Sequence, residues 1–333
     1  MTDRGVRLGP LATLRALFVL SRPAGMLLVA LLPILGFVFA YWDHGCIEAA
    51  SVSLPRLVLL ALIWAVPHAG TMWLNAALDR DEAPTLFGQK AAVPAQIEAW
   101  AYGSLAVSLA AAAWLEGRLF LAVLGCALLS VLYSHPRTAW KGHALLGPLV
   151  NVLGYGVLSP LGGFFLTGFA PTLRGLAVLL TALPWIATAY FAAQAFQEDE
   201  DRARGYRTLV AMRGAAFTLR VTRGCFLAAL ALTAGLAALG WFPRLILASL
   251  PLFLWVDRLL VAWTKQPSGG DAGWAKRYFL RLTATGLAVL ALVSLDYETS
   301  MRSTGRPGGL TTAAGRSEPR RCEGLWPPVR AVP

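Results

Sequence analysis

Long apolar stretches that carry almost no charge dominate this sequence and limit what it can fold into. Nine of them are about as long as a membrane-crossing helix, and they cover residues 17–41, 54–78, 97–115, 119–134, 144–168, 173–196, 218–240, 243–263 and 278–296. Lipid offers no hydrogen-bond partners, so a chain inside a membrane must satisfy its own backbone, and runs without strand-like alternation do so as helices. Of the 333 residues, 57% are hydrophobic and only 14% are charged, whereas about 25% are charged in a typical soluble domain. We therefore predict an all-α integral membrane protein with about nine transmembrane helices.

The basic residues are distributed unevenly around these stretches, and their distribution predicts an orientation. With a cytoplasmic N-terminus, most arginines and lysines lie on the cytoplasmic side, and the opposite loops hold only Arg56, Arg118, Arg174 and Arg244. An excess of basic residues on cytoplasmic loops is the positive-inside pattern of membrane proteins. The formal net charge of +11 therefore reflects membrane topology, and we expect no nucleic-acid partner. The expected location is the inner (cytoplasmic) membrane, crossed several times.

The same pattern divides the chain into three parts. Residues 1–16 form a cytoplasmic N-terminal segment, residues 17–296 form the membrane domain, and residues 297–333 form a tail rich in Gly, Pro and Arg. A tail of this composition cannot bury enough apolar surface to become ordered, so we predict that it is disordered. The four cysteines lack the spacing of a metal site, and we assign them no metal or redox role.

Polar residues gather in two clusters at the cytoplasmic ends of two predicted helices. In the first, "NAALDRDEA", Asn75 and Asp79 are four residues apart and share a helix face, and Asp81 and Glu82 follow in the loop. The second is "QAFQEDEDRARGYRTL", where the spacing predicts one helical face that carries Gln194, Gln197, Glu198 and Asp201. Basic residues follow that face at Arg202, Arg204 and Arg207.

Two acidic faces on one side of a membrane have a specific chemical use. Mg²⁺ takes oxygen ligands, typically one or two carboxylates together with substrate phosphates. Arginines beside such a metal can neutralise the remaining charge of a diphosphate. Either cluster alone is equally well explained as a solvated loop, and the amides as helix-packing groups. Their occurrence on the same predicted side favours a binding site.

The two clusters resemble the motifs of the UbiA superfamily of intramembrane aromatic prenyltransferases. The first family motif is Asn-Asp-x-x-Asp-x-x-x-Asp; Asn75 and Asp79 match its first and fifth positions, and Ala76 and Ala83 replace two aspartates. The second motif is Asp-x-x-x-Asp before a basic, glycine-containing turn. Asp201 matches its second aspartate, and Gln197 replaces its first.

Two other segments extend this resemblance over about residues 15–296. "SRPAGMLLVALLPILG" resembles the first helix of the family, and "YSHPRTAWKGHALLGPLVNVLGYGVLSPLGG" resembles the segment from its fourth to its fifth helix. The resemblance implies a bundle of nine helices around a central cavity, with a polar cap over its cytoplasmic mouth.

The resemblance also assigns roles to residues by their position. The implied ligands of a Mg²⁺ cofactor are Asn75, Asp79, Gln197, Glu198 and Asp201. The implied diphosphate contacts are Asn75, Lys90, Lys141, Arg204 and Arg207. The residues expected to carry catalysis are Asp79, Asp201 and Lys141. Asn151 and Tyr155 either face the cavity for the acceptor or prenyl chain or pack between helices, and we interpret His68 as a packing or capping residue.

These assignments lead to one favoured function and two alternatives. The favoured function is Mg²⁺-dependent transfer of a prenyl group from an isoprenoid diphosphate to an aromatic or other lipid-soluble acceptor, with release of pyrophosphate. The expected partners are the isoprenoid diphosphate, a membrane-accessible acceptor and membrane lipid. The first alternative is a UbiA-type membrane terpene cyclase. The second is a degenerate, non-catalytic lipid-binding member, because family aspartates are replaced by Ala76, Ala83 and Gln197.

Overall fold

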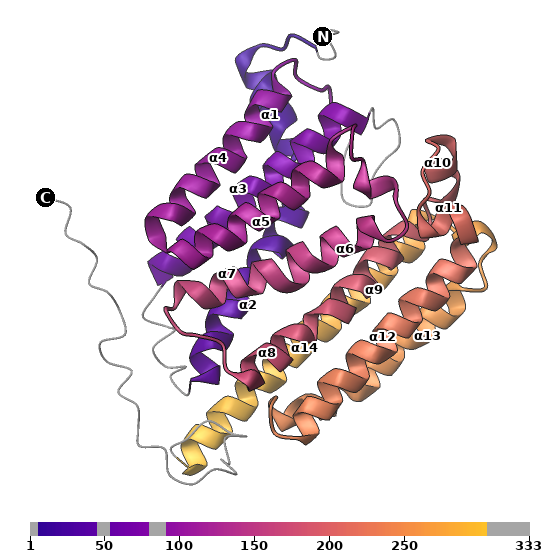
Figure 1. Ribbon diagram of the computed structural model, residues 1–333. Coiled ribbons are helices and arrows are strands. Elements are labelled where there is room, and N and C mark those ends of the chain that lie inside the picture. The colour runs from indigo at the N-terminus through magenta and orange to yellow at the C-terminus, as the bar shows by residue number, and fades with distance from the viewer. Residues whose placement is uncertain (1–5, 45–53, 80–90, 305–333) are drawn as a thin grey trace, which may run out of the picture. The chain divides into compact units, whose positions relative to one another are not determined.

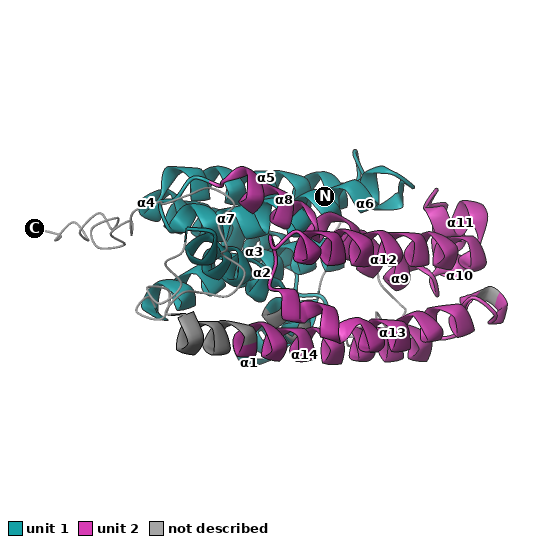
Figure 2. Ribbon diagram, turned by 90° about the horizontal axis from the view of Figure 1, so that it is seen from below, with its two compact units in different colours: residues 1–170 teal, residues 171–333 magenta. Residues whose placement is uncertain are grey.

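The computed structural model describes residues 6–44, 54–79 and 91–304, and the chain divides into two compact units, residues 1–170 and 171–333 (Figure 2). Both units are helical. No strand occurs among the described residues, where extended pairing is limited to an isolated bridge between Val6 and Pro94. The predicted all-α class is therefore confirmed.

Unit 1 begins with a short helix and continues as a bundle (Figure 1). Its first five helices are α1 (Pro10–Leu20), α2 (Pro23–Asp43), α3 (Leu54–Asp79), α4 (Ile97–Leu115) and α5 (Gly117–Ser134). They are followed by the 3-10 turn η2 (Trp140–Gly142), α6 (Leu146–Leu153), the π-helical turn η3 (Gly154–Leu158) and α7 (Ser159–Leu166). The closest pairings in this bundle join α3 to α4 and α2 to α7.

The first predicted stretch, residues 17–41, is split between α1 and α2, so its expected start is corrected. α1 ends at Leu20, and Arg22 adopts a left-handed conformation with a φ of 52° before α2 begins. Pro23 causes this break, because it has no N–H to continue α1 and its ring disfavours a helical residue before it. α1 instead contacts α3, where the indole N–H of Trp73 donates to the carbonyl oxygen of Leu17 at 2.8 Å.

Two Pro-x-x-Gly segments bring the backbones of α2 and α7 together. They run from Pro33 to Gly36 and from Pro160 to Gly163. A Cβ added to Gly36 would overlap the carbonyl oxygen of Pro160, and a Cβ added to Gly163 would overlap that of Pro33. Glycines permit such close crossings, which gain van der Waals contact where lipid provides no hydrophobic drive for helices to associate.

Unit 2 is built from helices that follow residue 171. It contains α8 (Leu173–Leu180), α9 (Ala182–Gln194), α10 (Glu198–Ala203), α11 (Leu209–Arg213) and α12 (Ala215–Ala238). It continues with η4 (Arg244–Ser249), α13 (Leu250–Trp263), η5 (Pro267–Gly269) and α14 (Ala272–Thr304). α12 packs along α9, and α14 contacts α13. α14 runs past the predicted end of the membrane domain at residue 296, so the first residues of the predicted tail are helical, and the remainder lies outside the described residues.

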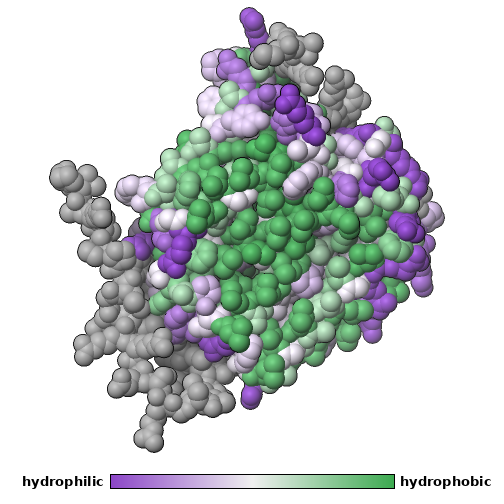
Figure 3. All heavy atoms as spheres, viewed as in Figure 1, coloured by the Kyte–Doolittle hydropathy of each residue, from purple (hydrophilic) through white to green (hydrophobic). Residues whose placement is uncertain are grey.

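Seven helical segments of the described chain are long and apolar enough to cross a membrane. They cover Leu54–Leu78, Gly117–Ser134, Leu146–Leu166, Leu173–Gln194, Ala215–Ala238, Arg244–Trp263 and Ala272–Leu295. The other two predicted stretches are also helical, as α2 and α4, but are not among these seven, so the count of nine stays a prediction. On the face shown in Figure 3, hydrophobic side chains cover the helices and hydrophilic ones gather mainly at their ends. This pattern is that of an integral membrane protein.

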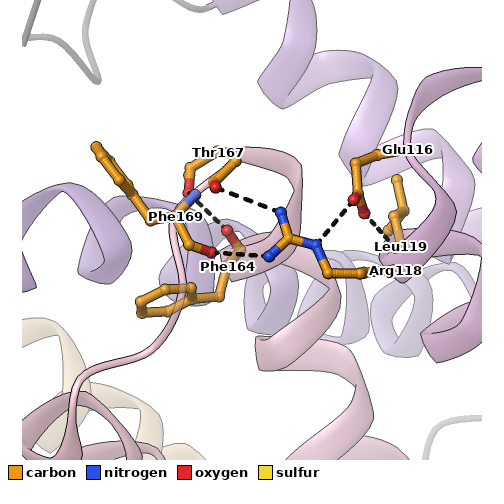
Figure 4. Close-up of polar contacts among 7 residues, drawn as sticks. Glu116, Arg118, Leu119, Phe164, Thr167 and Phe169 are labelled. Atoms are coloured by element: carbon orange, nitrogen blue, oxygen red, sulfur yellow. Dashed lines mark hydrogen bonds and ion pairs between the residues drawn. The ribbon is translucent and has the colours of Figure 1, made fainter. Parts of the chain in front are cut away.

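A charged cluster joins the α4–α5 connection to the end of α7, and we call it the Arg118 clamp (Figure 4). The Glu116 carboxylate accepts from the backbone N–H of Leu119 at 2.7 Å and from Arg118 Nε at 2.9 Å. The same guanidinium donates to the carbonyl oxygens of Phe169 and Gly168, both at 3.3 Å. The clamp therefore caps the start of α5 and fixes the chain after α7, with each carboxylate oxygen engaged inside the protein.

Candidate functional site

The first polar cluster lies at the end of α3, where Asn75 is the buried member. Only 8% of Asn75 is exposed, and its side-chain oxygen accepts a hydrogen bond from the hydroxyl of Ser134 at the end of α5. Asp79 is the last residue of α3, one turn further along, as the spacing predicted. The side chain of Asp79 and all of Asp81, Glu82 and Lys90 lie outside the described residues.

Lys141 follows α5 in the chain, a few residues after Ser134. It belongs to the short turn η2, which follows α5 and contacts both α5 and α6. Its side chain is partly exposed. Unit 1 therefore carries an amide oxygen on α3, a hydroxyl at the end of α5 and an ammonium group in the turn that follows.

The second cluster departs from its predicted geometry because its residues do not share one continuous helix. α9 ends at Gln194, and α10 starts at Glu198 after a turn that contains Gln197. The single face predicted for Gln194, Gln197, Glu198 and Asp201 is therefore interrupted. A new helix start at this point places Glu198, Asp199, Glu200 and Asp201 in a first turn, where the helix dipole stabilises negative charge.

Asp201 is the buried carboxylate of this turn, with 7% of the residue exposed. The Thr208 hydroxyl donates to Asp201 Oδ2 at 2.6 Å, and the backbone N–H of Tyr206 donates to the Asp201 carbonyl oxygen at 2.9 Å. Gly205, with a φ of +71°, allows the chain to turn back and bring Thr208 to this position. Burial raises the pKa of Asp201 above its ordinary value, the Thr208 hydrogen bond opposes this shift, Glu200 adds to it and Arg204 opposes it.

The other charged residues of the turn are held mainly by one another. The Glu198 carboxylate accepts from the backbone N–H of Ala215 at 2.8 Å, at the start of α12, and from Arg202 at 2.7 Å. Glu200 forms an ion pair with Arg204 at 2.7 Å. To bind a metal or a phosphate, Glu198 and Arg204 would therefore have to exchange these contacts. Arg207 is exposed and Gln197 is partly buried.

Asn151 and Tyr155 lie at the junction of α6 and η3 and differ in their contacts. The Asn151 amide donates to the carbonyl oxygen of Gly147 in its own helix at 3.0 Å. The Tyr155 hydroxyl reaches across the unit to Nδ1 of His68 on α3, at 3.4 Å. These contacts place the Tyr155 side chain in the interior of unit 1, whereas the Asn151 amide is hydrogen-bonded to the backbone of its own helix.

Sequence reasoning assigned no part in the site to three residues that contact the predicted site residues. Ser134 binds Asn75, Thr208 binds Asp201, and His68 contacts Tyr155. Thr208 carries a recognisable signal, because a threonine directly before an apolar helix is a typical N-cap, and it accepts from the N–H of Ala211 at 3.3 Å. Ser134 and His68 meet their partners over long sequence separations, which no local pattern predicts.

The donors present suit a hard cation. No group of three or more His, Cys, Asp or Glu side chains gathers as a metal centre within the described residues. The Asn75 amide and the Asp201 carboxylate nevertheless offer oxygen ligands of the type that Mg²⁺ takes together with phosphates and water. Among the described residues Asp201 makes no ion pair, and Thr208 engages one of its two carboxylate oxygens. The chemistry of the donor set therefore fits Mg²⁺.

The comparisons with known proteins identify the family. The model of the UbiA prenyltransferase family matches residues 30–283, which include both polar clusters. The chain therefore belongs to the UbiA prenyltransferase family. No curated protein matches it.

Solved structures show that the fold is shared along most of the chain. A UbiA homologue from Archaeoglobus fulgidus bound to GPP and Mg²⁺ has 19% identity and a TM-score of 0.57, covering 84% of this chain and 99% of its own. A UbiA homologue from the same organism bound to DMAPP and Mg²⁺ has 19% identity, the same two coverages and a TM-score of 0.58. A structure described as giving insights into digeranylgeranylglyceryl phosphate synthase in membranes has 15% identity and a TM-score of 0.58, covering 84% and 98%.

Proposed function

We propose that the protein transfers a prenyl group from an isoprenoid diphosphate to a lipid-soluble acceptor inside the membrane, in a Mg²⁺-dependent reaction that releases pyrophosphate. The observation that carries this proposal is the buried Asp201 carboxylate, which is held by a hydroxyl rather than an ion pair in the second family motif. Asn75 supplies the corresponding buried oxygen in the first motif. Homologous structures that contain GPP or DMAPP with Mg²⁺ support the substrate class.

The chain's own residues have distinct parts in this proposal. Asn75, Asp79, Gln197 and Asp201 would hold a Mg²⁺ ion, and Glu198 would join them only by giving up its contacts with Ala215 and Arg202. The metal would supply positive charge to the diphosphate leaving group. Lys141, Arg204 and Arg207, with Lys90 from the segment after α3, contact phosphate oxygens. The bond between the prenyl carbon and the diphosphate oxygen breaks, and that oxygen keeps the electron pair. The acceptor atom supplies a new electron pair to the prenyl carbon and loses a proton.

The location of the reaction is part of the same proposal. The basic residues concentrate on the side that carries both motifs, and this distribution supports a site facing the cytoplasm. The apolar helices supply a hydrocarbon environment for the prenyl chain. We propose the inner membrane as the place of the reaction.

Binding of a thiolated geranylgeranyl diphosphate tests this function without requiring the acceptor. The purified protein in detergent is titrated with the analogue with and without Mg²⁺, and we expect binding that requires the metal and is lost in Asp79→Ala. Arg118→Met is the matched control, because it removes a charge outside both motifs. Absence of binding in a protein that retains its helical spectrum and thermal transition would overturn the proposal and favour a non-catalytic member.

Incubation with geranylgeranyl diphosphate and Mg²⁺ alone separates transfer from cyclisation. For a transferase lacking its acceptor, we expect slow hydrolysis or no reaction. A cyclic hydrocarbon product would contradict prenyl transfer and identify a terpene cyclase with the same ionisation site. Asp201→Asn in parallel shows whether any product depends on this site.

A further inference from the structure

In unit 2, α13 and α14 share a surface where arginines lie on tryptophan rings. The guanidinium of Arg281 on α14 is 4.5 Å from the ring centre of Trp255 on α13, and it donates to the Trp255 carbonyl oxygen at 3.1 Å. One turn nearer the start of α14, the guanidinium of Arg277 is 4.4 Å from the ring centre of Trp274. Stacking on an aromatic ring holds a guanidinium in place without neutralising its charge.

A third arginine, Arg258, belongs to the same surface. Trp255 contacts Arg281, whereas Trp263, nearer the end of α13, contacts Tyr278, nearer the start of α14, with ring centres 6.1 Å apart. Contacts in this order show that the two helices run antiparallel. Arg258 is exposed and lies three residues after Trp255, so it is a neighbour of Trp255 on the helix surface, beside α14. We call the surface formed by Trp255, Arg258, Trp274, Arg277 and Arg281 the Trp–Arg face.

The positive charge of the Trp–Arg face is not neutralised within the part of the chain that the structure describes. Its three arginines make no ion pair there. The carboxylate of Asp257 on α13 is engaged by Arg223 of α12, whose Nε and Nη2 donate to its two oxygens at 2.7 and 2.9 Å. The carboxylate of Asp271, before α14, accepts from the backbone N–H of Gly273 at 2.9 Å. A bound anion would therefore supply the missing negative charge.

The Trp–Arg face lies toward the end of unit 2 that carries the acidic turn. The connection between α13 and α14 packs at that end, because a Cβ added to Gly269 would overlap the carbonyl oxygen of Ala195 after α9 and crowd Ala215 at the start of α12. Further from this end, exposed leucines follow on both helices, with Leu254 56% exposed and Leu287 64% exposed. Tryptophan and arginine between a polar helix end and an apolar exterior are typical of the membrane–water interface.

We propose that the Trp–Arg face binds the phosphate of an anionic phospholipid from the leaflet on the side of the acidic turn. The guanidinium groups donate to the phosphate oxygens, and the acyl chains lie along the exposed leucines. A lipid with a net negative charge is favoured over a zwitterionic one, because a choline group would bring positive charge to a face that already carries three positive charges. This inference is independent of the proposed reaction.

Retention of two lipids with identical acyl chains tests this inference. The full-length protein is immobilised in detergent and incubated with an equimolar mixture of dioleoyl phosphatidylglycerol and dioleoyl phosphatidylcholine. After washing, mass spectrometry quantifies both lipids that stay bound. We expect phosphatidylglycerol to be retained about tenfold over phosphatidylcholine. Equal retention of the two lipids would overturn the inference.

Two double variants with the same change of charge locate the preference on the protein. Arg277→Gln/Arg281→Gln removes two guanidinium groups from the face and should reduce the preference for phosphatidylglycerol to about twofold or less. Lys265→Gln/Lys276→Gln is the matched control, because both lysines are exposed near the same end of unit 2 and neither belongs to the face. This control should keep the wild-type preference. An equal loss in both double variants would show diffuse attraction to basic charge and contradict the proposed site.

Trp255→Leu tests the stacking while every charge of the face is kept, and it decides the question if the arginine double variant loses its thermal transition. Without the ring beneath Arg281, the preference for phosphatidylglycerol should fall about threefold. An unchanged preference would contradict a guanidinium positioned by this ring. Inorganic phosphate at millimolar concentration should not displace the bound lipid, because it lacks the acyl chains. Displacement by phosphate would identify a site for soluble anions and overturn the lipid assignment.

Discussion

The Arg118 clamp and the acidic turn around Asp201 use similar side chains but treat their carboxylates differently. In the clamp one carboxylate, Glu116, meets one guanidinium, and both side chains are partly exposed, at 24% and 42%. In the acidic turn Glu198 and Glu200 are likewise paired with arginines, whereas the more deeply buried Asp201 is held by a hydroxyl. A buried carboxylate without an ion pair costs stability, so its presence favours a role in binding. This is the difference expected between carboxylates that hold the fold and one that is available to a ligand.

The largest effect is expected from Asp201→Asn. The amide keeps an oxygen for Thr208 but removes the negative charge, so metal-dependent binding of the thiolated diphosphate should weaken about 100-fold. Thermal stability should not fall, because a buried charge is lost and its hydrogen bond is kept. Isothermal titration and thermal unfolding in detergent measure the two effects. Unchanged affinity would mean that Asp201 belongs with the structural carboxylates.

Glu198→Gln, in the same turn, should lower the stability of the protein but have little effect on its affinity for the diphosphate. It weakens the cap on Ala215 at the start of α12 and the contact with Arg202. The free energy of unfolding should fall by about 1–2 kcal/mol, whereas diphosphate binding should change less than tenfold. A loss of binding as large as that of Asp201→Asn would instead show that Glu198 is a metal ligand, as the family resemblance implies.

Arg118→Met should affect stability alone, and by less. Its ion pair with Glu116 is partly exposed and screened by solvent, so its loss should lower the free energy of unfolding by about 1 kcal/mol. Diphosphate affinity should stay at the wild-type value, because the clamp belongs to neither motif. Chemical denaturation and the same binding titration check this pair of outcomes. Reduced affinity for the diphosphate in a fully folded variant would mean that the Arg118 clamp also takes part in binding, unlike a purely structural ion pair.

The smallest effect is a pH dependence with a defined sign. Because burial raises the pKa of Asp201, the folded state binds its proton more tightly than the unfolded state does. Its contribution to stability is therefore present at low pH and is lost as the pH rises through the raised pKa, above the 3.8 of an ordinary aspartate. Relative to Asp201→Asn, the wild-type protein should lose stability from acidic to neutral pH. Parallel unfolding curves at each pH would contradict this.

The sequence predicted the fold class well because membrane helices follow from hydropathy alone. The apolar stretches recur as helices, and the two motifs occur at the ends of α3 and α9–α10 as expected. The errors lie where local backbone chemistry intervenes, at the Pro23 break and at the new helix start before Glu198. The hydrogen-bond partners of the site residues could not be predicted, because contacts such as that of Asn75 with Ser134 depend on tertiary packing. The contact between His68 and Tyr155 was missed for the same reason.

The crossing of α2 and α7 has a consequence for how this sequence can change over time. Each Pro-x-x-Gly segment supplies the glycine that admits the proline carbonyl of the other, so the relation between Pro33–Gly36 and Pro160–Gly163 is reciprocal. A substitution at either glycine alone pushes against backbone, which no side-chain rearrangement relieves. Gly36 and Gly163 are therefore expected to be retained together, or replaced together, as related sequences diverge.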